Sequence, residues 1–191
     1  MKNINRLSKI SFFILSIVLA FTSTAQSNET KSTKDLDFLI GDWSVTRTYR
    51  PSTENERVMK GSLICKESLD GKFINCRYEM TRPGKANGID EVFFNYNSIY
   101  DTYESLWLSS TWPIKVLMQG TLQRTNGKLN LNTLADFEIE NGVIEYVKDE
   151  LILDGTRESQ SSFKRETHIR TSNSKDNAWI HHMTEVAEKN S

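Results

Sequence analysis

Hydrophobic and polar residues alternate with a period of two through most of the chain after residue 41. Short alternating or apolar runs recur, and turn residues separate them, which is typical of β-strands joined as a meander. The pattern predicts ten strands, near residues 42–50, 58–68, 73–81, 89–97, 102–110, 114–124, 128–135, 143–154, 160–171 and 177–187.

The connections between these runs carry residues suited to tight turns. Asp70-Gly71, Asn126-Gly127 and Asn141-Gly142 tolerate positive φ and favour hairpins. Consecutive strands joined in this way predict an all-β fold, a closed up-and-down antiparallel β-barrel of about 8–10 strands, because closure removes the exposed edges of a sheet. Such a barrel either holds one small ligand or is filled by its own side chains, and the sequence leaves both open.

The beginning of the chain has a different pattern. Three basic residues, Lys2, Arg6 and Lys9, precede an apolar run, Ile10–Phe21, and small residues follow that run. A helix that spans a bilayer needs about 20 apolar residues, so this shorter run predicts a signal peptide over residues 1–25. We therefore expect the mature protein to be periplasmic or secreted. An uncleaved signal anchor is the alternative.

The rest of the chain divides into two segments. Residues 26–34 are polar and predict a flexible leader, and residues 35–188 predict one barrel domain that opens with a short N-terminal helical turn. Without residues 1–25 the chain has 21 basic and 25 acidic residues, a net charge of about −4. It has no basic stripe, so we expect no nucleic-acid partner. The first cysteine is Cys65, so no lipid anchor is expected near the cleavage site.

The hairpin centred on Asp70-Gly71 fixes which residues of its two strands are opposite each other. In that register Cys65 faces Cys76 and Leu63 faces Tyr78. Export to an oxidising compartment favours a disulfide between the two cysteines. A two-residue turn, however, would make them a hydrogen-bonded pair with Cα atoms about 5.5 Å apart, which is less suitable. A disulfide and two buried free thiols both remain open.

Alternation within the strands also identifies side chains that could line the interior and contact a ligand. The candidates are Leu63, Tyr78, Phe94, Tyr96, Tyr103, Trp107 and Met118. Burial of apolar ligand surface against them would supply affinity. Arg165 or His168 would orient a polar group of the ligand. An Arg165 that pairs with a glutamate, or stacks on Trp43, is the competing interpretation.

The three histidines lie late in the chain, His168 on one predicted strand and His181-His182 on the next. Because adjacent residues of a strand point to opposite faces, only one of His181 and His182 can join His168, and two histidines make a weak metal or haem site. No metal or cofactor is therefore expected. Nucleotide-binding and hydrolase motifs are missing from the sequence. An enzyme would need a histidine–carboxylate pair inside the barrel, with His168 as the candidate.

Gly41 and Trp43 mark the junction between the helical turn and the first strand. A bulky aromatic residue at such a junction usually packs there, so we expect Trp43 to close the base of the barrel. A cation from the last strands, Arg165 or Arg170, would cover its ring.

The segment Leu36-Asp37-Phe38-Leu39-Ile40-Gly41-Asp42-Trp43 resembles the opening Leu-x-x-Leu-x-Gly-x-Trp of an exported bacterial family whose function is unknown. Residues 92–97 with Tyr103 and Trp107 are similar to its central aromatic hairpin, and residues 163–168 to its final strands. The resemblance implies a calycin-type barrel like the lipocalins and fatty-acid-binding proteins, with no established activity. Asn97 departs from the aspartate usual there, and the pattern of haem-binding nitrobindins is missing, so haem binding is not implied.

Three functions follow from these observations. The first is an exported binding protein whose barrel holds a small, mostly hydrophobic molecule. The second is an enzyme that uses a histidine and a carboxylate inside the barrel. The third is a structural or interaction module with a filled core.

Overall fold

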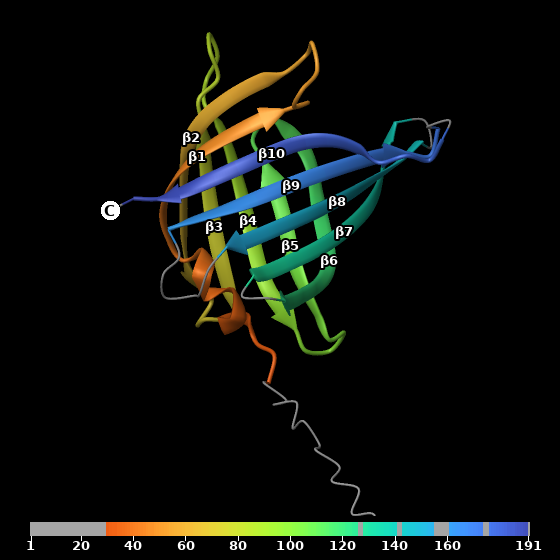
Figure 1. Ribbon diagram of the computed structural model, residues 1–191. Helices are drawn as coiled ribbons and strands as arrows, with labels where there is room; N and C mark the ends of the chain where they lie inside the picture. The colour runs from red at the N-terminus through yellow and green to blue at the C-terminus, as the bar shows by residue number, and fades with distance from the viewer. Residues whose placement is uncertain (1–29, 126–127, 141–142, 155–160, 174–175, 191) are drawn as a thin grey trace, which may run out of the picture. The chain divides into compact units, whose positions relative to one another are not determined.

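The computed structural model describes residues 30–190 except 126–127, 141–142, 155–160 and 174–175. The predicted signal peptide, residues 26–29 of the predicted leader, and the Asn126-Gly127 and Asn141-Gly142 turns lie outside these residues. Ten antiparallel strands form a closed barrel in which consecutive strands pair and the last strand pairs with the first (Figure 1). The predicted all-β, up-and-down barrel is confirmed.

All ten predicted strands are present. The strand predicted to end at residue 135 continues for five more residues to Glu140, which pairs with Val143 of the next strand. The described residues include no helix long and apolar enough to cross a membrane. The strands are β1 (Gly41–Tyr49), β2 (Arg57–Ser68), β3 (Phe73–Met80), β4 (Gly88–Asn97), β5 (Thr102–Ser109), β6 (Trp112–Thr125), β7 (Lys128–Glu140), β8 (Val143–Asp154), β9 (Ser162–Thr171) and β10 (Ile180–Lys189).

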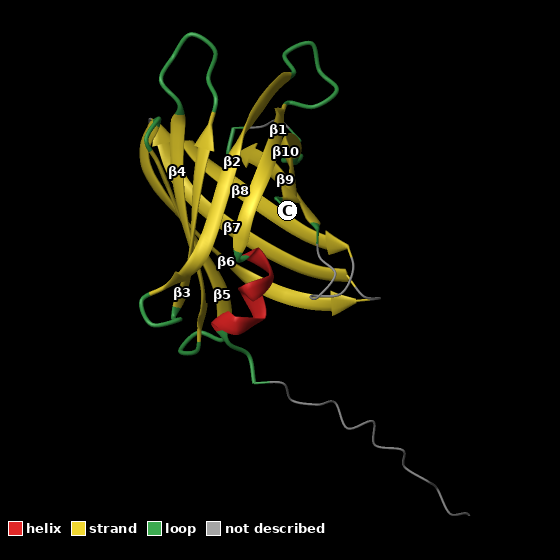
Figure 2. Ribbon diagram, turned by 90° about the vertical axis from the view of Figure 1, so that its left-hand side faces the viewer, coloured by secondary structure: helices red, strands yellow, loops and turns green. Residues whose placement is uncertain are grey.

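The helical turn is a 3-10 helix, η1 (Thr33–Leu39), at one end of the barrel (Figure 2). It begins two residues before the predicted turn because Asp35 caps it: the backbone N–H of Ser32 donates to Asp35 Oδ2 at 2.7 Å. Thr33 Oγ1 accepts a hydrogen bond from the backbone N–H of Tyr96 at 3.1 Å, which ties the helix to β4. The apolar side of η1 is buried against the barrel, through Leu36, Phe38 and Leu39.

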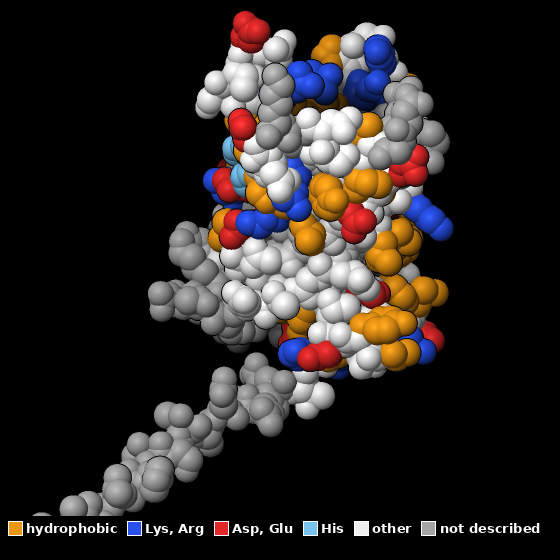
Figure 3. Space-filling model, turned by 90° about the vertical axis from the view of Figure 1, so that its right-hand side faces the viewer, with side chains coloured by type: hydrophobic (Ala, Val, Ile, Leu, Met, Phe, Trp, Pro, Cys, Tyr) orange, Lys and Arg blue, Asp and Glu red, His pale blue; other side chains and the backbone are white. Residues whose placement is uncertain are grey.

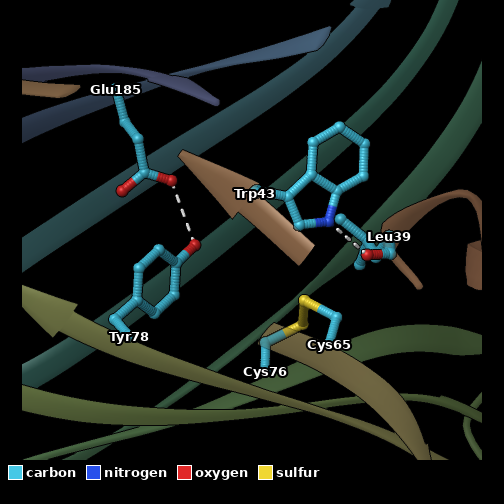
Figure 4. The surroundings of a disulfide bond; sticks show 6 residues. All are labelled: Leu39, Trp43, Cys65, Cys76, Tyr78 and Glu185. Carbon is cyan, nitrogen blue, oxygen red and sulfur yellow. Dashed lines mark hydrogen bonds between the residues drawn. A yellow bond between two sulfur atoms is a disulfide. The ribbon is translucent and has the colours of Figure 1, made fainter. Parts of the chain in front are cut away.

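Trp43 packs beside η1, as its position in the sequence predicts. Its side chain is fully buried, and the indole Nε1–H donates to the carbonyl oxygen of Leu39 at 2.8 Å (Figure 4). Phe163 packs edge-on against the ring, and the ammonium of Lys189 lies 5.2 Å from the ring centroid. The cation over Trp43 is therefore Lys189, and the prediction of Arg165 or Arg170 is wrong.

Gly41 permits this closure at the start of β1. Its φ of 141° lies in a region that residues with a Cβ rarely adopt. A Cβ at this position would also lie 2.8 Å from Cε of Lys189, the residue that covers Trp43. Glycine at position 41 therefore allows both the unusual backbone conformation and the close approach of the Lys189 side chain.

β2 and β3 pair in the predicted register, and Cys65 and Cys76 form a disulfide inside the barrel (Figure 4). Their Cα atoms are 4.0 Å apart, close to the spacing of a non-hydrogen-bonded pair. The expected hydrogen-bonded pair is wrong because four residues, Leu69–Lys72, separate the two strands instead of two. Hydrogen-bonded and non-hydrogen-bonded pairs alternate along an antiparallel ladder. When the loop gains one residue on each side, every hydrogen-bonded position therefore becomes a non-hydrogen-bonded one and the reverse.

Removal of the disulfide by the double substitution Cys65→Ala/Cys76→Ala is expected to lower the free energy of unfolding by about 3 kcal/mol, because the unfolded chain regains the entropy of the closed loop. Urea unfolding of the oxidised protein, the reduced protein and the double variant measures this loss. Equal midpoints for the oxidised and reduced proteins would contradict it.

Candidate functional site

The side chains on the inner wall of the barrel fall into three levels between η1 and the opposite end. The level next to η1 is an apolar core that contains Trp43, the disulfide and two buried aromatic residues, Phe94 and Tyr103. One step further along five of the strands, each inward-facing residue is charged. These five residues are Arg47, Asp90, Asp149, Arg165 and Glu185, which we call the charged layer.

The strand registers explain why these charges meet. Arg47 of β1 is opposite Glu185 of β10, and Glu185 is opposite Arg165 of β9. Directly opposed residues of neighbouring strands share a face of the sheet. Each charged residue lies two positions from an apolar core residue on its own strand, as Arg47 does from Val45, and therefore faces the interior as well.

Ion pairs and hydrogen bonds join the charged layer into two groups. Arg47 Nε donates to Glu185 Oε2 at 2.5 Å, and Arg47 Nη1 donates to Asp90 Oδ2 at 2.8 Å. Arg165 Nε donates to Asp149 Oδ2 at 2.8 Å. The pairing matters because an unpaired charge is costly to bury, and Glu185 is fully buried while Arg47 is 3% exposed.

Two hydroxyl groups complete these bonds. Tyr78 donates to Glu185 Oε1 at 3.0 Å (Figure 4), and Thr167 Oγ1 donates to Asp149 Oδ1 at 2.6 Å. Burial, reinforced by the charge of Glu185, raises the pKa of Tyr78 well above its usual range. The phenol therefore stays protonated and acts as the hydrogen-bond donor to Glu185. Burial alone would lower the pKa of Arg47, but Glu185 and other neighbours outweigh it and the pKa is raised.

A cavity of about 400 Å³ lies on the other side of the charged layer from the core. Arg47, Asp149 and Arg165 form its inner end. Its walls are mostly apolar, and they come from β5 to β10: Trp107, Trp112, Val116, Met118, Phe137, Val147, Ile169 and Met183. The rings of Trp107, Trp112 and Phe137 pack in series, with centroids 5.8 Å and 5.6 Å apart, and form an aromatic wall.

Three of the predicted ligand-contacting residues line this cavity: Trp107, Met118 and Arg165. Arg165 also forms the predicted internal ion pair, with an aspartate, Asp149, instead of a glutamate. Four others belong to the buried core or its edge with the charged layer, where they contact protein: Leu63, Tyr78, Phe94 and Tyr103. Tyr96 packs against the same core, and its hydroxyl donates to Asp101 at 2.7 Å.

Those five residues are not among the side chains that line this cavity, because they lie in the core next to η1 or, for Tyr78, against the charged layer. Alternation along a strand determines the face on which a side chain lies. It does not determine how far along the barrel axis the side chain lies, and that distance decides between core and cavity here.

His168 does not line the cavity, so it does not contact a ligand bound there. It lies one residue from Thr167, which is buried inside, so its side chain is on the outer face of β9. There it stacks on His181 of β10, with ring centroids 4.8 Å apart. A histidine–carboxylate pair built on His168 inside the barrel is excluded by the same geometry. Among the described residues no group of three or more His, Cys, Asp or Glu side chains could hold a metal ion.

His182, Tyr49 and Arg50 line the outer end of the cavity and were not among the predicted site residues. β10 has a bulge at His182, because His181 pairs with His168 while Met183 pairs with Thr167. The sequence carries no signal for this bulge. For Arg47, Asp90, Asp149 and Glu185 a signal exists, since each is a charged residue at an inward position of an alternating strand.

Burial lowers the pKa of His182 below its usual value of 6.5, and the charges of Arg50, Arg57 and His181 add to this effect against the opposing charge of Asp149. The unfolded chain therefore takes up this proton at a higher pH than the folded protein. The contribution of His182 to stability is complete above about pH 6.5 and is lost as the pH falls below that value.

We expect His182→Gln to reduce the loss of unfolding free energy between about pH 7.5 and pH 5. Urea unfolding of the wild type and the variant at both pH values measures the difference. NMR titration of the His182 ring gives the pKa directly, and a value at or above 6.5 would contradict the expectation.

The sequence was compared with protein-family models and with curated proteins, and neither comparison gave a match. A comparison of the fold with solved structures gave a similar barrel in the crystal structure of Rv2717c from M. tuberculosis, with a TM-score of 0.62. The superposition covers 83% of this chain and 96% of that chain, at 10% sequence identity. At this identity the likeness is one of fold.

Proposed function

We propose that this protein is an exported binding protein whose barrel holds one small, mostly hydrophobic molecule in the cavity beyond the charged layer. The observation that carries the proposal is the cavity itself. Its volume of about 400 Å³ is within the range of small-molecule sites. Such sites combine apolar walls with a few polar groups that orient the ligand, and the aromatic wall and the charged layer are arranged in this way.

The cavity favours a binding protein over the two other functions considered. A module with a filled core would need side chains in this space, and here a cavity occupies it beyond the charged layer. An enzyme built on His168 would need that histidine inside, whereas it lies on the outer face.

Export is supported by the signal-peptide pattern of residues 1–25 and by the disulfide. Disulfides persist in the periplasm and outside the cell, where thiols are oxidised. The resemblance of residues 36–43 to an exported family of lipocalin-like barrels agrees with this proposal.

Native mass spectrometry of the protein purified from its own host tests the proposed binding. We expect an additional bound mass, and a rise in melting temperature when the stripped protein is mixed with members of a panel of lipids and porphyrins. A ligand at about 100 times its Kd adds about 2.7 kcal/mol to the free energy of unfolding. A ligand-free mass together with no shift across the panel would contradict the proposal.

Two tryptophan variants locate the site. Trp112→Ala removes part of the aromatic wall and is expected to weaken binding about tenfold, since about 1.4 kcal/mol of apolar contact is lost. Trp179→Ala is the matched control, because Trp179 is 37% exposed and is not among the residues that line the cavity. Equal affinities of the two variants would place the ligand elsewhere.

A further inference from the structure

Three neighbouring strands bring polar side chains together at the mouth of the cavity, the end farthest from η1. Tyr49 of β1 is opposite Arg57 of β2 on one side and Met183 of β10 on the other. Opposed residues share a face, so all three lie on the inner face of the barrel. The Arg57 guanidinium lies 5.1 Å from the centroid of the Tyr49 ring, and the His182 ring packs edge-on against the same tyrosine at 5.8 Å.

Two irregularities of the backbone add Arg50 and His182 to this face. Arg50 follows the last residue of β1 with a φ of 49°, a left-handed conformation that is unfavourable for a residue with a Cβ. His182 is the extra residue of the β10 bulge. The two irregularities are joined, because the backbone N–H of Arg50 donates to the carbonyl oxygen of His182 at 2.7 Å. Regular alternation would place Arg50 on the outer wall, yet both side chains line the cavity.

A second hollow, of about 360 Å³, lies beside the mouth and is lined by Tyr49, Arg50, Asn55, Arg57 and His182. It shares Tyr49, Arg50 and His182 with the main cavity, so the two spaces adjoin. None of the residues that line it is a carboxylate. On the face drawn in Figure 3, Lys and Arg side chains lie next to hydrophobic ones at the upper end of the molecule.

The arginines of the mouth differ from those of the charged layer in their partners. Arg47 and Arg165 are each held by carboxylates inside the barrel. Within the part of the chain that the structure describes, no salt bridge joins a carboxylate to Arg50 or Arg57. Glu145 lines the main cavity from β8, and burial raises the pKa of its carboxyl group. To an anion that enters from solvent, Arg50 and Arg57 therefore present guanidinium groups that no ion pair within the described residues holds.

We propose that the ligand is an anionic amphiphile whose head group binds Arg50 and Arg57 at the mouth while its apolar tail lies against the aromatic wall. This inference rests on the proposed binding function. The planar guanidinium donates paired hydrogen bonds to carboxylate and phosphate oxygens, so either head group fits. The amide of Asn55 is a further donor in the same hollow.

Binding of four ligands built on a ten-carbon chain tests the inference: decanoate, decyl phosphate, the neutral ester methyl decanoate and the cation decylamine. Isothermal titration calorimetry measures each Kd, with inorganic phosphate as a fifth ligand without a tail. We expect the two anionic amphiphiles to bind at least tenfold more tightly than the ester, and decylamine to bind most weakly of the four. Inorganic phosphate is expected to bind far more weakly than decyl phosphate.

The double variant Arg50→Gln/Arg57→Gln separates the head-group site from the tail site. The double variant is expected to raise the Kd of decanoate and of decyl phosphate about tenfold and to leave the Kd of methyl decanoate unchanged. Both arginines are exposed, so the variant is expected to keep its melting temperature. Arg77→Gln is the matched control, because Arg77 is an exposed arginine on the outer face of β3 and is paired with Glu91.

Each outcome decides between the proposals. An ester that binds as tightly as decanoate, or tight binding of decylamine, overturns the anionic head group and leaves the proposed binding function intact. Inorganic phosphate that binds as tightly as decyl phosphate overturns the amphiphile. If none of the tailed ligands binds, the inference fails, and the mass measured on protein from its own host decides whether the proposed function fails with it.

Discussion

Replacement of Trp43 by alanine is expected to lower the free energy of unfolding by about 4 kcal/mol. The side chain is fully buried at the base of the barrel, where it contacts Phe163 and bonds to the backbone of Leu39. Loss of the indole would leave a cavity. The disulfide and the paired strands β1 and β10 hold the surrounding residues, which limits how far these residues can move to fill the cavity. Urea unfolding followed by circular dichroism measures the change.

Trp179→Ala and Trp43→Phe are the comparisons for this experiment. Trp179 is 37% exposed and contacts Arg170, so its loss is expected to cost less than about 1 kcal/mol. Trp43→Phe keeps an aromatic ring but not the hydrogen bond to Leu39, and we expect an intermediate loss. If Trp43→Ala and Trp179→Ala unfold at the same urea concentration, Trp43 does not close the base.

Arg47→Met is expected to cost about 3–5 kcal/mol, because it leaves two carboxylates, Glu185 and Asp90, inside the barrel without their cation. Methionine keeps much of the length of the side chain, so the loss reports mainly on charge. The free energy of unfolding in urea gives the size of the effect. Arg77→Met, which removes an exposed ion pair with Glu91, is the control and is expected to cost less than about 1 kcal/mol.

A double-mutant cycle shows whether the loss comes from the pair or from packing. Addition of Glu185→Gln to Arg47→Met removes one of the carboxylates left unpaired. The loss of unfolding free energy in the double variant is therefore expected to be about 1–3 kcal/mol smaller than the sum of the losses in the two single variants. Strictly additive losses would contradict a direct interaction between Arg47 and Glu185 across the β1–β10 pair.

The fold could be predicted because its signals are local. Alternation with a period of two gives strands, and hairpin turns such as Asp70-Gly71 join each strand to the next. With ten consecutive strands, closure of the sheet is the arrangement that leaves no edge unpaired. The register of β2 and β3 followed from the same turn, although the number of loop residues, and with it the type of the Cys65–Cys76 pair, did not.

The site was predicted only in part, because its position depends on the height of each residue along the barrel axis. Trp107 lines the cavity and Tyr103, four residues earlier on the same face of β5, is in the core. Parity shows only that Arg165 and His168 cannot both face inward, since three positions separate them, and it does not tell which of the two does. Arg50 and His182 reach the mouth through irregular backbone geometry, which a single sequence does not reveal.

The pairing of β1 with β10 joins the two ends of the domain. The first strand to leave the ribosome therefore has one edge without a partner until the last ten residues of the domain have been synthesised. Over the same interval Arg47 lacks its partner Glu185, and Trp43 lacks the cover of Lys189. Non-local pairing of this kind makes folding slow. A chain that ends before residue 180 would have β1 and β9 as open edges, ready to pair with other chains and aggregate.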